Sequence, residues 1–212
     1  MSTCNLTIES LANEDFCQNK MSGVKLMYFI PQTDVTAINA TLANVKTNFV
    51  DYVEIGSATM EGQAFTVASG KGFAKLYCTK DLGELKYAVQ GAGVGSRSFK
   101  ATLEVFHPSF KKKILGFLGT MINQEMIVVV VLNNGEIHLL GDLYRGAQVA
   151  DGVEATSGKA VTDQNGLTLN IEWDTPMPQI FYEGWSPEDA THGLPLIAAS
   201  AAAAEESEEE GE

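Results

Sequence analysis

The sequence predicts a mainly β protein with one α-helix, and three observations support this fold class. Hydrophobic residues make up 45% of the 212 residues and charged residues only 19%, a balance that allows one good core. The 20 glycines mark frequent turns between short apolar runs. Only one window has clear helical periodicity, so strands must supply most of the regular structure.

The centre of the predicted fold runs from Leu85 to Arg145, where strands surround the predicted helix. Alternating or continuous apolar residues, bounded by turn residues, predict each strand. The segments in order are a strand pair at Leu85–Gln90 and Ser98–Phe106, a helix, the highly β-prone Met126–Leu132, and Glu136–Leu140 after an Asn-Asn-Gly turn.

The predicted helix spans about 109–121 and has one apolar face. The residues of this face recur at helical spacing and are Phe110, Ile114, Phe117, Leu118 and Met121. Lys111, Lys112 and Lys113 fall in its first turn, where the helix dipole disfavours cations. These lysines are either a solvated face or a contact with carboxylates of a neighbouring subunit.

The chain before this centre predicts an N-terminal arm at residues 1–22, packed along the domain, and then several strands. Val24–Ile30 ends at Pro31, Val35–Ile38 is short, and the stretch 47–55 alternates imperfectly.

A long β-hairpin arm follows at about 56–78, with a glycine-rich tip. Few large apolar residues lie along its outer half, so its tip is a candidate subunit interface at Gly70, Lys71, Gly72 and Phe73. The alternative is a strand pair within the same sheet.

The chain after Arg145 begins with a glycine-rich loop, Gly146–Gly158, in which Val149 and Val153 are further candidate interface residues. A half-buried strand follows, because Leu167, Leu169, Ile171 and Trp173 alternate with polar residues. Phe181, Tyr182 and Trp185 form an aromatic group that either closes one end of the sheet or contacts a subunit or ligand. The main domain is therefore expected at 23–190, followed by a flexible alanine-rich, acidic tail at 191–212.

Charge and motifs narrow the function classes. The net charge of −13 leaves no basic surface of the kind that binds nucleic acid. Three cysteines, Cys4, Cys17 and Cys78, fit neither a disulfide framework nor a zinc site. No catalytic, phosphate-binding or metal-binding motif is present, so we expect no enzyme activity, cofactor or metal. No secretory signal or membrane-spanning run is found, so we expect synthesis in the cytoplasm and no membrane partner.

Several segments together resemble a family of phage and prophage virion proteins from Bacteroides-type hosts. The resemblance covers roughly residues 1–185. It is carried by Cys4-Asn5-Leu6, by Gly23-Val24-Lys25 with Tyr28-Phe29, by the lysine-bearing helix and the strands after it with Leu139-Leu140-Gly141, and by the run from Asp163 to Ile171. The acidic extension after about Ala190 departs from the family pattern.

The resemblance implies a tail tube protein, located in the virion tail. Such proteins have a β-sandwich or barrel with one flanking α-helix and a long hairpin arm. Their hexameric rings stack into a tube, and DNA passes through the lumen without specific binding. Expected partners are copies of the same chain and other tail or connector proteins. The alternatives are a head–tail connector or tail-completion ring, and a carbohydrate-binding β-sandwich that uses Trp173, Tyr182 and Trp185.

Overall fold

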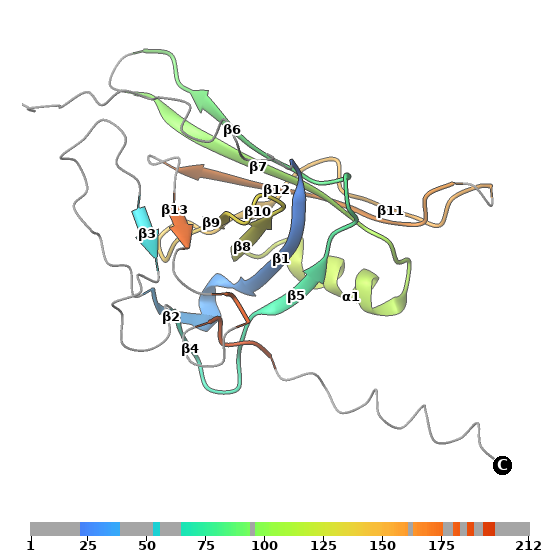
Figure 1. The fold of residues 1–212 in the computed structure, drawn as a ribbon, viewed down its shortest axis with the longest axis horizontal. Coiled ribbons are helices and arrows are strands. Elements are labelled where there is room, and N and C mark those ends of the chain that lie inside the picture. The colour runs from blue at the N-terminus through green and yellow to red at the C-terminus, as the bar shows by residue number, and fades with distance from the viewer. Residues whose placement is uncertain are drawn as a thin grey trace, which may run out of the picture.

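The computed structural model describes residues 22–38, 53–55, 65–93, 96–160, 163–175, 180–182, 186–188 and 193–197. Thirteen strands and one α-helix form within these residues, which confirms the predicted mainly β fold. Figure 1 shows most strands in two layers, with the helix to one side. The predicted N-terminal arm lies outside the described residues, apart from Ser22.

The larger sheet has six strands in the order β3-β13-β9-β8-β1-β5. All neighbours are antiparallel except β3 and β13, which are parallel. The strands span Val53–Ile55 (β3), Ile180–Tyr182 (β13), Ile137–Leu140 (β9), Met126–Leu132 (β8), Val24–Pro31 (β1) and Ala74–Tyr77 (β5). The strands predicted around Val24, Met126 and Glu136 are therefore confirmed, and the Asn-Asn-Gly turn joins β8 to β9 as expected.

The second sheet has five strands in the order β10-β12-β7-β6, and β11 also pairs with β12. These strands span Gln148–Val149 (β10), Gly166–Thr175 (β12), Ser98–His107 (β7), Glu84–Gln90 (β6) and Glu154–Thr156 (β11). The predicted pairing of the β6 and β7 segments is confirmed. The prediction of a plain loop at 146–158 is wrong, because β10 and β11 both add to the long strand β12.

One hydrophobic core fills the space between the two sheets. The side chains predicted to face one way on β12, from Leu167 to Trp173, are all buried in it. They meet alternate residues of β7 and the inner face of the larger sheet, which includes Val128 and Val130 of β8. Neither sheet closes on itself among the described strands, so no closed barrel forms there.

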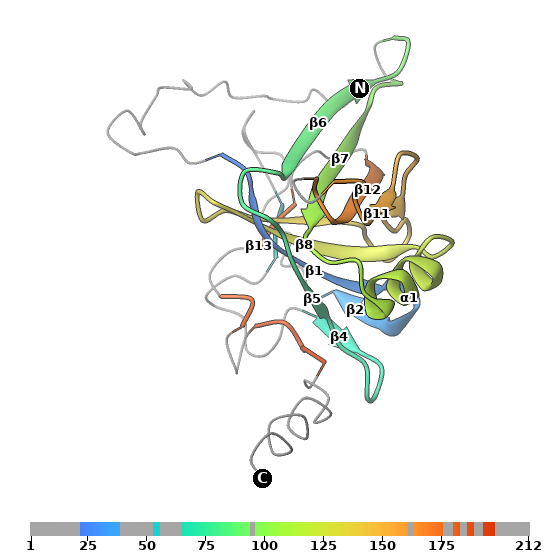
Figure 2. The same cartoon turned by 90° about the vertical axis from the view of Figure 1, so that its right-hand side faces the viewer.

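A third layer covers the other face of the larger sheet. It contains a two-stranded ribbon of β2 (Val35–Ile38) and β4 (Phe65–Val67), and a short 3-10 turn, Gln32–Asp34, leads into β2. Figures 1 and 2 both show this ribbon on the side away from β6 and β7. Ile127 and Val129 of β8 are buried in this second core. The run Met126–Val130 lacks polar alternation because both of its faces are covered.

The helix α1 spans Lys112–Met121 and starts later than the predicted residue 109. Lys111 precedes it in an extended conformation (φ −105°, ψ 162°), so Phe110 does not belong to the helix. Met121 is buried, and Phe117 packs on Phe29 of β1 with ring centroids 4.7 Å apart. The predicted apolar face therefore anchors the helix to the first core, although Phe110 does not contribute to it.

The predicted hairpin at about 56–78 is wrong where the structure describes it. β4 pairs with β2, whereas β5 pairs with β1 in the larger sheet, so the two segments neither form a hairpin nor share a sheet. The physical reason is that Phe65 and Phe73 are both buried, with ring centroids 5.0 Å apart, which holds the connecting turn against the second core. Residues 56–64 lie outside the described part of the chain.

Part of the predicted flexible tail is also packed against the body. Leu194 is buried in the second core, and Leu196 forms a parallel bridge with Phe73. The prediction that the chain is flexible from residue 191 is therefore wrong for 193–197, because an apolar side chain at 194 fills the second core. Residues 198–212 lie outside the described range.

A polar contact joins the two sheets at one end of the first core. The Tyr87 hydroxyl on β6 lies 3.2 Å from Nδ1 of His138 on β9. Burial is the main cause that lowers the pKa of His138, and Glu136, whose Oε2 lies 3.5 Å from Nε2, acts in the opposite direction. Burial also raises the pKa of Tyr87 to about 12. Both groups are therefore neutral in the folded protein near neutral pH.

We predict that His138 makes the folded state less stable in acid. The pKa of His138 in the folded state lies below its ordinary value of 6.5. Below pH 6.5, His138 therefore binds a proton more readily in the unfolded chain than in the folded chain. The free energy of unfolding should then fall as the pH drops from about 7 to 5, by up to about 1.4 kcal/mol per pH unit. His138→Asn keeps a polar group at the Nδ1 position and should show a shallower fall in urea titrations. Parallel pH curves for the two proteins would contradict this.

Candidate functional site

The first group of predicted interface residues lies at the turn between β4 and β5. Gly70 and Lys71 are exposed, and Lys71 Nζ lies 3.4 Å from Asp34 Oδ2. Gly72 and Phe73 are buried, since the exposed fraction of Phe73 is 1%. Only the outer half of this predicted site is therefore open to another molecule.

The buried half of this turn is occupied by the chain's own C-terminal segment, residues 193–197. The N–H of Phe73 donates to the Pro195 carbonyl at 2.7 Å, and the N–H of Ile197 donates to the Phe73 carbonyl at 3.0 Å. A Cβ at Gly72 would lie only 2.6 Å from the Pro195 carbonyl oxygen. The glycine is therefore needed for the close approach of two backbones.

The other two groups of predicted interface residues lie elsewhere (Figure 1). Lys111, Lys112 and Lys113 are exposed at the start of α1, and none of them forms an ion pair with another described residue. Val149 of β10 and Val153 in the turn after it are half-buried against the first core. The structure therefore does not bring the three groups into one site, and it gives the two valines a packing role.

The five-stranded sheet instead presents a mostly polar surface, interrupted by Ala88 and Phe106, which we name the outer sheet face. Directly paired residues of adjacent strands point to the same side of a sheet, and the side opposite Ala101, Leu103 and Val105 faces away from the core. The charged and polar side chains on this face are Glu84, Lys86, Gln90, Ser98, Lys100, Thr102, Glu104, Gln148, Glu154, Thr156, Thr168, Asn170, Glu172 and Asp174.

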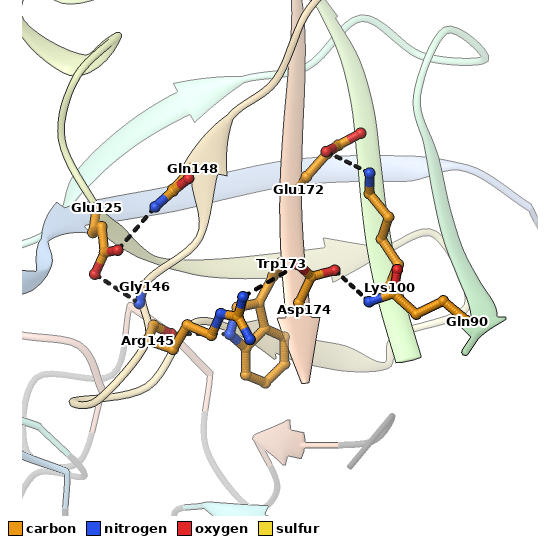
Figure 3. Close-up of polar contacts among 9 residues, drawn as sticks. All are labelled: Gln90, Lys100, Glu125, Arg145, Gly146, Gln148, Glu172, Trp173 and Asp174. Atoms are coloured by element: carbon orange, nitrogen blue, oxygen red, sulfur yellow. Dashed lines mark hydrogen bonds and ion pairs between the residues drawn. The ribbon is translucent and has the colours of Figure 1, made fainter. Parts of the chain in front are cut away.

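Ion pairs and hydrogen bonds hold the middle of the outer sheet face in place (Figure 3). Lys100 Nζ lies 2.6 Å from Glu172 Oε2, and this hydrogen bond is the main cause that raises the pKa of Lys100. Asp174 accepts from Gln90 Nε2 at 2.7 Å and from the Arg145 guanidinium at 3.4 Å. The carboxylates of Glu172 and Asp174 on β12 are thereby joined to β6, to β7 and to the loop before β10.

A small hollow of about 110 Å³ lies beside this network, between β10 and β12. It is lined mainly by Arg145, Gln148, Val149, Glu172, Trp173 and Asp174. The Trp173 indole N–H donates to the Arg145 carbonyl at 2.9 Å, and its side chain is only 2% exposed. Both carboxylates that line the hollow have cationic partners, Lys100 for Glu172 and Arg145 for Asp174.

The described residues also contain no cluster of three or more His, Cys, Asp or Glu side chains that could hold a metal ion. Within the same residues, no helix is long and apolar enough to cross a membrane. Cys78 is buried, and burial raises the pKa of its thiol to about 12, so it is not a reactive nucleophile near neutral pH.

Comparisons of this chain with protein-family models, curated proteins and solved structures found no match. The resemblance to phage tail proteins therefore stays a prediction from the residues that carry it.

The outer sheet face was not predicted from the sequence, although the alternation of apolar and polar residues in β12 indicates part of it. The alternation that places Leu169 and Trp173 inward also places Asn170, Glu172 and Asp174 outward. The sequence could not show that Lys100 and Gln90 would lie beside them, because that proximity depends on the register between β6, β7 and β12.

We predict that Gly72→Ala destabilises the protein by about 1–3 kcal/mol, because the new Cβ would collide with the backbone of residues 195–197. Gly93→Ala is the matched control, since nothing lies within 4 Å of a Cβ there. It should change stability by less than about 0.5 kcal/mol. Urea denaturation measures both, and equal midpoints would show that the C-terminal segment does not depend on Gly72.

Proposed function

We propose that this protein is a phage tail tube subunit whose copies form stacked rings around a DNA channel. The sequence resemblance supports the class of protein. The mainly β body with one flanking helix is compatible with it, and we take the two sheets around the first core as the β-sandwich of that family. The proposed partners are copies of this chain, other tail or connector proteins, and DNA that passes without specific binding.

The observation that carries this proposal is the charge of the outer sheet face. It has five carboxylates (Glu84, Glu104, Glu154, Glu172 and Asp174) and two lysines (Lys86 and Lys100), and the Arg145 guanidinium that pairs with Asp174 adds a third cation, which gives a net charge of 3 − 5 = −2. A flat polar face with excess negative charge repels phosphate groups at close range. We place this face toward the channel, where repulsion lets DNA slide without binding.

The exposed lysines at the start of α1 remain candidates for a contact between neighbouring subunits. Lys111, Lys112 and Lys113 are solvent-exposed cations on a chain with a net charge of −13. Carboxylates on a neighbouring copy are therefore abundant enough to form ion pairs with these lysines. The carbohydrate-binding alternative loses support, because Trp173 is buried and cannot stack on a sugar. Tyr182 and Trp185 have no described side-chain positions.

We expect the purified protein to assemble into rings and stacked tubes. Mass photometry gives the subunit number, and negative-stain electron microscopy distinguishes tubes from rings. Single rings without stacking would favour a connector or tail-completion protein instead. A chain that stays monomeric at high concentration would contradict the proposal.

We further predict that Glu104→Lys makes the assembled protein retain DNA. Glu104 is exposed and lies directly opposite Glu84, so the substitution replaces a like-charge pair by an opposite-charge pair and should leave the fold intact. A lysine facing the channel would contact phosphates, and retention of duplex DNA present during assembly should fall steeply with added salt.

The control for this prediction is Thr120→Lys combined with Gln124→Lys. Both residues are exposed at or just beyond the end of α1, and together they add the same two units of positive charge. This variant should retain as little DNA as the wild type in a filter-binding assay. Equal retention by the two variants would show that only net charge matters and that the outer sheet face does not border DNA.

A further inference from the structure

The strand β6 forms an open edge of the five-stranded sheet. Among the described strands it pairs only with β7, over all seven of its residues. In an antiparallel pair, alternate N–H and C=O groups of an edge strand point away from its partner and can accept a further strand. Figures 1 and 2 show β6 on the rim of the molecule. Val89 near its end is 61% exposed, although Leu85 and Tyr87 on the same face pack against the first core.

The first described residues, Ser22 and Gly23, lie beside the start of this edge. Ser22 and Gly23 line a hollow of about 450 Å³ together with Gly83, Glu84 and Leu85. Their position is fixed by Asn133, whose Nδ2 donates to the Ser22 carbonyl at 2.7 Å and whose N–H donates to the Gly23 carbonyl at 3.0 Å. The segment that precedes Ser22 therefore starts from a defined point next to β6.

The sequence of this segment contains a strand pattern that fits the edge. Cys4, Leu6 and Ile8 are apolar and alternate with Asn5, Thr7 and Glu9. A strand with this pattern, added beside β6, would place its apolar side over the exposed rim of the first core at Val89. Its polar side would extend the outer sheet face. A strand in the opposite register would bury polar groups against the core, so the pattern also specifies the register.

We propose that residues 4–9 of one copy add as a strand to the β6 edge of a second copy. Residues 10–21 supply twelve linking residues with a reach of about 40 Å, which exceeds the roughly 23 Å that the seven residues of β6 span, so the segment can reach beyond its own β6 edge. This inference rests on the proposed function in that copies of the chain must meet. It names the segment and the edge that join them.

The first test exploits the two sides of the predicted strand. Leu6→Lys combined with Ile8→Lys removes its apolar side, and Asn5→Lys combined with Thr7→Lys adds the same charge to its polar side. Hydrogen–deuterium exchange of the β6 amides in the wild-type assembly should be at least about tenfold slower than in the first variant, and the control should match the wild type. The same β6 exchange in all three proteins would overturn the proposal.

The second test identifies the copy that supplies the strand. In a Cys17→Ser background, Val89→Cys places a thiol on the β6 edge, and Cys4 provides the other thiol for a short bifunctional thiol reagent. Cys78 is buried and does not compete. Covalent dimers and higher species on a denaturing gel support exchange between copies. Cross-links within single chains only, or none, would overturn it.

The two proposals fail in different ways. If tubes form, but β6 exchange in the wild type equals that of the Leu6→Lys, Ile8→Lys variant and the Val89→Cys variant gives no cross-link between chains, the strand addition is removed and the tail tube function is kept. Cross-linked dimers without rings or tubes would keep the strand addition and remove the tail tube function.

Discussion

The burial of β8 on both faces is the constraint on which the rest of the structure depends. Val128 and Val130 point into the core between the two large sheets, while Ile127 and Val129 point into the core under the β2–β4 ribbon. Each fully buried side chain of this kind contributes about 1.5–3 kcal/mol, so neither face can be left open to water. The three-layer order follows, because each face of this strand requires its own cover.

Local patterns were sufficient to predict the strands whose surroundings are uniform along their length. The alternation in β12 and the continuous apolar run in β8 each reflect a constant environment, so their periods are visible in the sequence. The segment 65–77 could not be predicted in the same way. Its two apolar anchors pack on each other, but Phe65 lies in β4 and Phe73 directly precedes β5. These two strands have different partners, and pairing between distant segments leaves no local pattern.

The candidate surfaces differ in how far the sequence could identify them. The lysines at the start of α1 are exposed as a polar run predicts, whereas Val149 looked like an exposed loop residue and proves to be half-buried. The outer sheet face depends on cross-strand neighbours such as Lys100 and Glu172, which are 72 positions apart. Short strands such as β10 were missed because two residues have no measurable period.

The attachment of residues 193–197 to Phe73 has a mechanical consequence. Two backbone hydrogen bonds hold this segment at the turn before β5, whereas β1 shares long ladders with both β5 and β8. Tension applied at the C-terminus would load those two bonds before it reached either ladder. The segment would therefore act as a release point that yields first, and only then would the load reach β13, the next strand of the larger sheet along the chain.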